Sequence, residues 1–126
     1  MADRGPVNVL IADDHLLFAE SVEALLSSEK KIRVVGRAEN GEEAARLATD
    51  LRPDLVLMDI SMPVLDGFAA ARQIRAALPD TCVLFLTGSN SPADVRQAQA
   101  AGGSGYVTKD RIATELVDAI FAAADC

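Results

Sequence analysis

The sequence predicts an α/β domain built on a doubly wound parallel sheet, and two observations carry this prediction. Short apolar runs alternate five times with longer stretches of helical periodicity. Two of these runs, 55–58 and 83–86, are apolar at every position, as expected of central strands buried on both faces. Strict alternation favours a parallel sheet with helices on both faces and right-handed crossovers. Five such units fit the strand order 2-1-3-4-5.

Each element has its own local signal. The apolar runs predict strands at 7–11, 32–35, 55–58, 83–86 and 105–107. The helical periodicities between and after them predict helices at about 16–28, 41–52, 68–78, 92–101 and 111–121. Asn40, Ser91 and Asp110 are expected to cap the second, fourth and fifth helices, with Glu43 at the capping-box position. Pro53 and Pro79 are expected to end the second and third helices.

Composition restricts the class of protein further. A chain of 126 residues is long enough for one core, so residues 1–126 are expected to form a single domain. The net charge, 12 − 19 = −7, argues against nucleic-acid binding through a basic face. No stretch has membrane-spanning length and no signal peptide is visible, so a cytoplasmic protein is expected. Cys82 is expected to be a small core residue and Cys126 an exposed one, without a disulfide framework.

Chemically versatile residues follow the strands where each strand ends. They are Asp13 and Asp14 after the first strand, Asp59 after the third, Thr87 after the fourth and Lys109 after the fifth. Each could have an ordinary role alone, since aspartate often caps helices and most lysines are exposed. Their convergence at the ligand-binding edge of an open α/β sheet favours a functional site.

This set of residues suits a magnesium ion and phosphoryl transfer. Clustered carboxylates repel one another unless a cation is present, and Mg²⁺ prefers a few carboxylates, a carbonyl and water. Asp14 and Asp59 could bind the ion directly, Asp13 through water, and the backbone carbonyl near Ser61 could complete the set. An oxygen of Asp59 could then act as nucleophile and form an aspartyl-phosphate, with Lys109 and Thr87 contacting the phosphoryl oxygens.

Four motifs resemble those of a known family. They are VLIADDH (Val9 to His15), DLVLMDISMPVLDG (Asp54 to Gly67), VLFLTGS (Val83 to Ser89) and GYVTKD (Gly105 to Asp110). Together they cover nearly the whole chain, which resembles the receiver domain of two-component response regulators of the NarL/LuxR type. The resemblance implies a flavodoxin-like (βα)5 fold and a phosphorylation switch rather than an enzyme.

The resemblance also implies roles for single residues and partners. Asp59 would be the phospho-acceptor for a sensor histidine kinase, and Asp13 and Asp14 would hold Mg²⁺. Thr87 and Lys109 would contact the phosphoryl group, and Tyr106 would be the switch aromatic. Phosphorylation would change the face formed by the fourth helix, fifth strand and fifth helix, or a homodimer surface on the first and fifth helices. A helix-turn-helix output domain, absent from these residues, would bind DNA and control transcription.

Some positions depart from the common pattern of the family. Asp110 follows Lys109 where many members have proline, so a trans bond is expected there. Gly88 and Gly103 stand where alanine is usual, and the approach to the last strand is therefore expected to be loose. His15 is expected to be stabilised by its acidic neighbours rather than to be catalytic.

The sequence leaves four alternative functions open. A haloacid-dehalogenase-like phosphatase also uses a strand-end aspartate, but it needs a second aspartate two residues later, where this chain has Ser61. A flavin- or nucleotide-binding protein would need a glycine-rich phosphate fingerprint, which the sequence lacks. A receiver that is never phosphorylated would not need the intact set of site residues. A stand-alone receiver would act by protein–protein interaction.

Overall fold

The computed structural model describes residues 5–88 and 91–126. In these residues five strands alternate with five helices, and the strands form one parallel sheet in the order β2-β1-β3-β4-β5. The strands are β1 (Val7–Ala12), β2 (Ile32–Ala38), β3 (Leu55–Asp59), β4 (Cys82–Thr87) and β5 (Gly105–Thr108). The helices are α1 (Leu16–Ser27), α2 (Gly41–Leu51), α3 (Gly67–Ala77), α4 (Pro92–Ala100) and α5 (Ile112–Ala123). The predicted fold class and strand order are confirmed.

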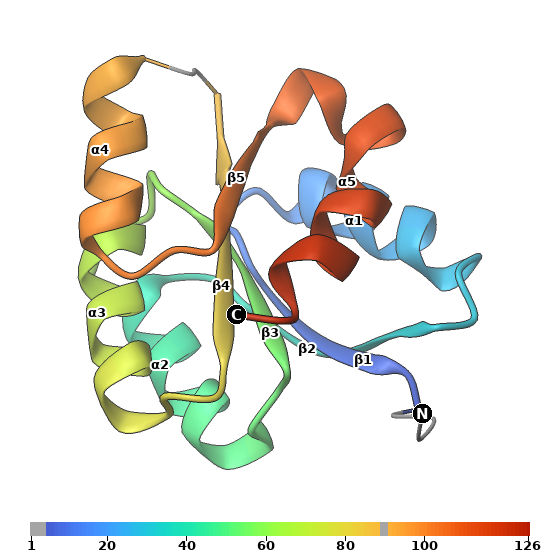
Figure 1. The fold of residues 1–126 in the computed structure, drawn as a ribbon, viewed down its shortest axis with the longest axis horizontal. Helices are drawn as coiled ribbons and strands as arrows, with labels where there is room; N and C mark the ends of the chain where they lie inside the picture. Colours follow the sequence, from blue (N-terminus) through green and yellow to red (C-terminus); the bar gives the residue numbers. More distant parts are fainter. Residues whose placement is uncertain (1–4, 89–90) are drawn as a thin grey trace.

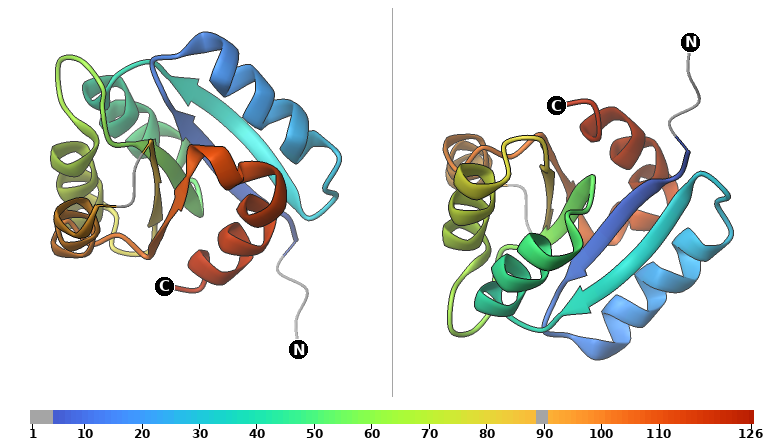
Figure 2. Two further views of the ribbon diagram at one scale, coloured as in Figure 1. Left: turned by 90° about the horizontal axis from the view of Figure 1, so that it is seen from above. Right: turned by 90° about the horizontal axis from the view of Figure 1, so that it is seen from below.

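The helices form two layers on opposite faces of the sheet. Helices α2, α3 and α4 cover one face, and α1 and α5 cover the other (Figures 1 and 2). Alternate side chains of β3 serve the two cores: Val56 and Met58 pack with the first group of helices, Leu55 and Leu57 with the second. A strand that is buried on both faces must be apolar throughout, which explains the unbroken run in the sequence.

Side-chain caps fix the starts of two helices at the predicted residues. Asn40 accepts a hydrogen bond from the backbone N–H of Glu43 at 2.8 Å, and Ser91 accepts one from Asp94 at 3.2 Å. The Glu43 carboxylate returns to the N–H of Glu39, one residue before the cap, at 2.8 Å. The capping-box glutamate therefore stabilises the entry to α2, but through a different donor.

The start of α5 differs from the prediction. Residues Lys109–Arg111 form a short 3₁₀ turn, and Arg111 rather than Asp110 occupies the cap position, without a capping hydrogen bond from its side chain. Lys109, the first residue of this turn, follows β5 directly, and its ammonium group lies near Asp13 and Asp59 at the carboxyl ends of β1 and β3. The Lys109–Asp110 bond is trans, because none of the described peptide bonds is cis.

The approach to β5 is tight, so the expectation of a loose approach is wrong. A Cβ atom on Gly103 would lie 2.6 Å from a ring carbon of Phe85 and 2.9 Å from the carbonyl oxygen of Ala98. Phe85 is fully buried and packs against Phe68, with ring centroids 5.3 Å apart. The glycine therefore makes room for a large aromatic side chain in β4.

The two cysteines also differ from the prediction. Cys82 is buried in the core, as expected, but it forms a disulfide with Cys126, with a Cα–Cα distance of 5.8 Å. A separation of 44 residues gives no local signal for such a bond. Of the helices in the described residues, none is long and apolar enough to cross a membrane.

Candidate functional site

The predicted site lies at the carboxyl edge of the sheet, where four strands end. Asp59 is the last residue of β3 and Thr87 the last residue of β4, while Asp13 and Lys109 directly follow β1 and β5. The strand register explains the convergence, because Asp59 pairs with Leu86 and Thr87 pairs with Thr108 in the next strand. Parallel strands that end at one level bring these side chains to one place.

The loop after β3 folds back onto Asp59. The N–H of Gly67 donates a hydrogen bond to the carbonyl of Ile60 at 3.0 Å. A Cβ atom on Gly67 would lie 2.2 Å from the carbonyl oxygen of Asp59, so only glycine permits this close approach. Within the loop, the N–H of Leu65 bonds to the carbonyl of Pro63 at 2.8 Å across Val64, whose φ is +70°. This tight turn keeps the loop next to the site.

Lys109 joins two buried carboxylates. Its Nζ atom lies 3.1 Å from Oδ2 of Asp13 and 3.4 Å from Oδ2 of Asp59. The side chain of Asp13 is fully buried and that of Asp59 nearly so. The same ammonium group lies 4.5 Å from the centre of the Phe18 ring on α1. One cation is therefore fixed between two anions and an aromatic face.

The carboxylates differ in their other partners. Oδ1 of Asp13 accepts a hydrogen bond from the N–H of His15 at 2.8 Å, and the His15 ring nitrogen Nδ1 lies 3.2 Å from the same oxygen. Nδ1 of His15 is also 3.3 Å from Oδ1 of the more exposed Asp14. The position of His15 between two acids agrees with the predicted structural role. Oδ1 of Asp59 accepts a hydrogen bond from the N–H of Ser61 at 3.4 Å.

The electrostatics of the site favour a proton or a cation at Asp59. Burial raises the pKa of the Asp59 carboxyl from its ordinary 3.8 to about 6, and the negative charge of Asp13 acts in the same direction. The charge of Lys109 and the N–H of Ser61 lower this pKa, but they do not offset the burial. One lysine is therefore not enough to neutralise the pair of aspartates.

The donor set fits a hard divalent cation. Side-chain donor atoms of Asp13, Asp14, His15 and Asp59 all lie within 4.8 Å of one another. Among the described residues, the buried side-chain oxygens that accept no hydrogen bond are Oδ2 of Asp13 and Oδ2 of Asp59. Both oxygens face the one Lys109 ammonium. A further cation can satisfy buried oxygens of this kind, and carboxylate oxygens suit Mg²⁺. That the carbonyl of Ser61 binds the ion stays a prediction.

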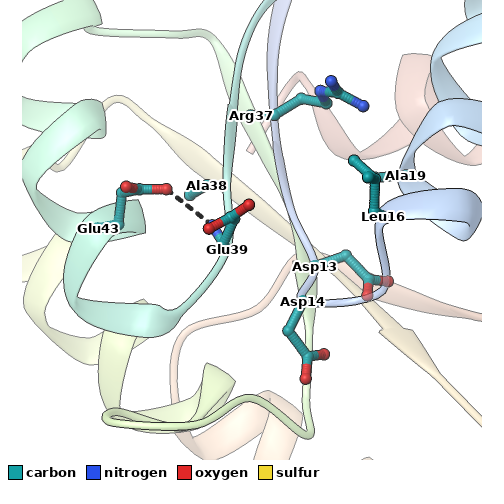
Figure 3. Close-up of a pocket in the computed structure, with 8 residues that line it drawn as sticks. All are labelled: Asp13, Asp14, Leu16, Ala19, Arg37, Ala38, Glu39 and Glu43. Carbon is teal, nitrogen blue, oxygen red and sulfur yellow. Dashed lines mark hydrogen bonds between the residues drawn. The ribbon is translucent and has the colours of Figure 1, made fainter.

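A cavity of about 310 Å³ adjoins the site, lined by the ends of β1 and β2 and the first turns of α1 and α2. Figure 3 shows Asp13 and Asp14 at one side of it and the hydrogen-bonded pair Glu39 and Glu43 across from them. Asp13 and Asp14 thus belong both to the site and to the lining of this open, mainly acidic hollow.

The two residues predicted for the switch lie on adjacent strands. Thr87 is buried at the end of β4, whereas Tyr106 on β5 is 40% exposed. Both line one small hollow with Val95 and Ala98 of α4. Ser89, at the end of the third sequence motif, lies outside the described residues.

Phe18 is the site residue that sequence reasoning did not find. It belongs to the apolar pattern of α1 and is half-buried against the core shared by α1 and α5. Nothing in that pattern separates an aromatic ring that packs in a core from one that also faces a lysine 91 residues later. Only the geometry of the fold shows the contact.

Known proteins have sequences similar to this one. The sequence pattern of the response regulator receiver domain family matches residues 9–121. The chain is 36% identical over 118 residues to the transcriptional regulatory protein DegU of Brevibacillus brevis, covering 94% of this chain and 50% of that protein. It is 38% identical over 114 residues to the response regulator protein VraR of Staphylococcus aureus, covering 90% and 54%. The chain therefore spans about half the length of the curated relatives it matches.

The fold is also similar to that of a solved response regulator structure. A two-component response regulator of the LuxR family from Aurantimonas sp. has a TM-score of 0.91 and 34% identity, covering 96% of this chain and 86% of that one. The likeness extends over all five strand–helix units. The chain belongs to the family of response regulator receiver domains, and its relatives place it with the NarL/LuxR type.

Proposed function

We propose that Asp59 is the phospho-acceptor and that a sensor histidine kinase is the phosphoryl donor. The observation that supports this most strongly is the buried Asp59 carboxylate, whose Oδ2 lies 3.4 Å from the Lys109 ammonium. As a receiver domain the protein is regulatory rather than a classical enzyme. The whole of residues 1–126 would act as this one domain.

In the proposed reaction an Asp59 oxygen attacks the phosphorus atom of the phosphohistidine. The P–O bond forms as the P–N bond breaks, and the imidazole nitrogen takes the electron pair and a proton. Lys109 stabilises the negative phosphoryl oxygens, and the Thr87 hydroxyl donates a hydrogen bond to them. Asp13, Asp14, Asp59 and the carbonyl of Ser61 would hold Mg²⁺, which would supply further positive charge to the phosphoryl oxygens. Lys109 and the N–H of Ser61 favour the deprotonated, attacking form of Asp59, whereas burial and the charge of Asp13 oppose it.

The switch would follow from the contact between Thr87 and the phosphoryl group. As Thr87 moves toward that group, space opens beside it and Tyr106 turns inward from its present, partly exposed position. This motion would change the face made by α4, β5 and α5. Helices α1 and α5 lie together on the face of the sheet away from α2, α3 and α4. Their outer surface, which includes the exposed Leu17 and Phe121, would form a homodimer surface.

The output of the switch is proposed by analogy with the relatives. DegU and VraR are described as a transcriptional regulatory protein and a response regulator, and both are about twice as long as the matched region. We propose that this receiver controls transcription through a separate DNA-binding domain. The domain itself would contact neither DNA nor membrane, and it would act in the cytoplasm.

The assignment of Asp59 is tested with acetyl phosphate and Mg²⁺. Intact mass measurement should show one added phosphoryl group on the unchanged protein and none on Asp59→Asn. Asp50→Asn is a matched control, because Asp50 is an exposed carboxylate on α2. It should be labelled like the unchanged protein. Stoichiometric labelling of Asp59→Asn would refute the assignment.

A further inference from the structure

The disulfide closes a loop around the half of the molecule that carries the switch. Cys82 is the first residue of β4, and Cys126 follows α5 at the end of the sequence. The loop between them contains β4, α4, β5 and α5, and with them Thr87, Tyr106 and Lys109. The bond therefore fastens the segment after α5 to the sheet.

The two cysteine residues have unequal access to solvent. Cys82 is 1% exposed and its N–H is hydrogen-bonded to the carbonyl of Asp54 at 3.0 Å, whereas Cys126 is exposed. A thiolate must approach the sulfur it attacks along an open path, so only Cys126 can be attacked from outside in the folded protein.

A fixed positive charge lies beside the accessible sulfur. Nη1 of Arg75 donates hydrogen bonds to the carbonyls of Pro79 at 2.8 Å and Thr81 at 2.7 Å, and it lies 3.7 Å from Sγ of Cys126. The two carbonyls hold the guanidinium group in place. A positive charge here attracts an incoming thiolate and stabilises the thiolate form of Cys126.

We propose that Cys126 is a site of reversible thiol exchange with low-molecular-weight thiols, and that Cys82 is its resolving cysteine. A small thiolate attacks Sγ of Cys126, the bond to Cys82 breaks, and the electron pair goes to Sγ of Cys82, which takes a proton. A second small thiolate attacks the small-molecule sulfur of the mixed disulfide and releases Cys126 as a thiolate. Two small thiols are thereby oxidised to one disulfide and the protein disulfide is reduced to two thiols.

The consequence of exchange is local. Leu116 and Ile120 of α5 are fully buried, so the helix stays packed on the sheet after reduction. The residues after Ala123 lose their covalent attachment to β4. Exchange thus releases the segment that follows α5, and it does so independently of phosphorylation at Asp59.

The test compares Cys82→Ala with Cys126→Ala after incubation of each folded protein with oxidised glutathione. Intact mass measurement should show a glutathione adduct on Cys126 in Cys82→Ala. The adduct should form at least about ten-fold more slowly in Cys126→Ala, where the remaining thiol is buried. Arg75→Gln in the Cys82→Ala background should slow adduct formation by roughly five-fold. Equal rates in the two cysteine variants would overturn the proposal.

A second measurement uses the unchanged protein, because Cys82→Ala alters a core position. The protein is equilibrated with glutathione buffers of increasing reducing strength, and its free thiols are then alkylated and counted by mass. The number of free thiols per protein should rise from none to two as the buffer becomes more reducing. The far-ultraviolet circular dichroism spectrum should stay unchanged. Two free thiols under every buffer, or loss of the fold when they appear, would contradict the proposal.

Discussion

At the scale of single residues, the site holds more negative charge than its one lysine can offset. Asp13 and Asp59 are both buried, and both share the Nζ atom of Lys109. The raised pKa of Asp59 is the physical result, because burial and the charge of Asp13 together outweigh the attraction of the lysine. A site in this state is unstable by itself and is stabilised by whatever adds positive charge.

The stability of the metal-free protein should therefore depend on pH through Asp59. The folded protein holds the Asp59 proton more tightly than the unfolded chain, since the pKa is about 6 instead of 3.8. This group's contribution to the free energy of unfolding is present below about pH 4 and is lost as the pH rises through 6. The two pKa values differ by about two units, which corresponds to roughly 3 kcal/mol.

Asp59→Asn should remove this pH dependence. Urea unfolding in a chelator at pH 7.5, a condition chosen to lie above the folded pKa of about 6, should show the variant more stable by roughly 2–3 kcal/mol. At a pH near 4 the difference should nearly vanish. Asp50→Asn removes the same charge from an exposed position. It should change the free energy of unfolding by no more than about 0.5 kcal/mol at either pH. Equal pH profiles for Asp59→Asn and the unchanged protein would contradict the assignment of the titrating group.

Phe18 should affect how fast Asp59 is phosphorylated. Its ring faces the Lys109 ammonium at 4.5 Å, a contact of about 0.5–1 kcal/mol at a partly exposed site. Phe18→Leu keeps an apolar side chain but lets the lysine leave the site more often. The rate of labelling by acetyl phosphate should fall roughly two- to five-fold. Phe121→Leu, at a half-exposed position on α5, is the control and should leave the rate unchanged.

At the scale of elements, β4 and the turn into β5 fit together through one aromatic ring and one glycine. The ring of Phe85 occupies the space that a side chain on Gly103 would need. Neither neighbour of that missing Cβ can move freely, because one is a fully buried ring and the other is the backbone carbonyl of Ala98. The position of β5, which carries Tyr106 and leads to Lys109, depends on this packing.

Gly103→Ala should therefore destabilise the protein by about 1–3 kcal/mol through overpacking. Gly88→Ala is a matched control, because a Cβ atom there would meet nothing within 4 Å. It should change the free energy of unfolding by less than about 0.5 kcal/mol. Urea unfolding measures both, and adding Phe85→Leu to Gly103→Ala should restore part of the loss. A neutral Gly103→Ala would show that the turn is as loose as its sequence suggests.

These elements show which parts of the structure the sequence could predict. The strands were predictable because an unbroken apolar run such as 55–58 is a local signal. The site was predictable because parallel strands end at a common edge, which brings Asp59 and Lys109 together. The tight fit at Gly103 was not, because the ring that fills the space lies 18 residues earlier in the chain. The same holds for the bond between Cys82 and Cys126, 44 residues apart.

At the scale of the whole molecule, the ion pairs of the site connect the carboxyl ends of three strands. Asp13 follows β1, Asp59 ends β3 and Lys109 follows β5, so charge at one point acts on three of the five strands. Any ligand that neutralises this point stabilises the whole fold, because it binds only where the strands are assembled. The chain's net charge of −7 adds a weaker attraction for cations of every kind.

Mg²⁺ should therefore raise the free energy of unfolding, by an amount set by its concentration relative to its Kd. At a concentration a hundred-fold above its Kd, the gain should be about 2.7 kcal/mol. Asp14→Asn should show a much smaller gain, since it removes a carboxylate that lies within reach of Asp13 and Asp59. Asp50→Asn, which makes the same change of charge on α2, should keep the full gain. Urea unfolding with and without Mg²⁺ measures all three proteins, with NaCl added to hold the ionic strength constant because salt alone screens the repulsion between the acids. If Asp14→Asn gained as much as the unchanged protein, the ion would be acting on the diffuse charge of the surface instead of at the ends of the strands.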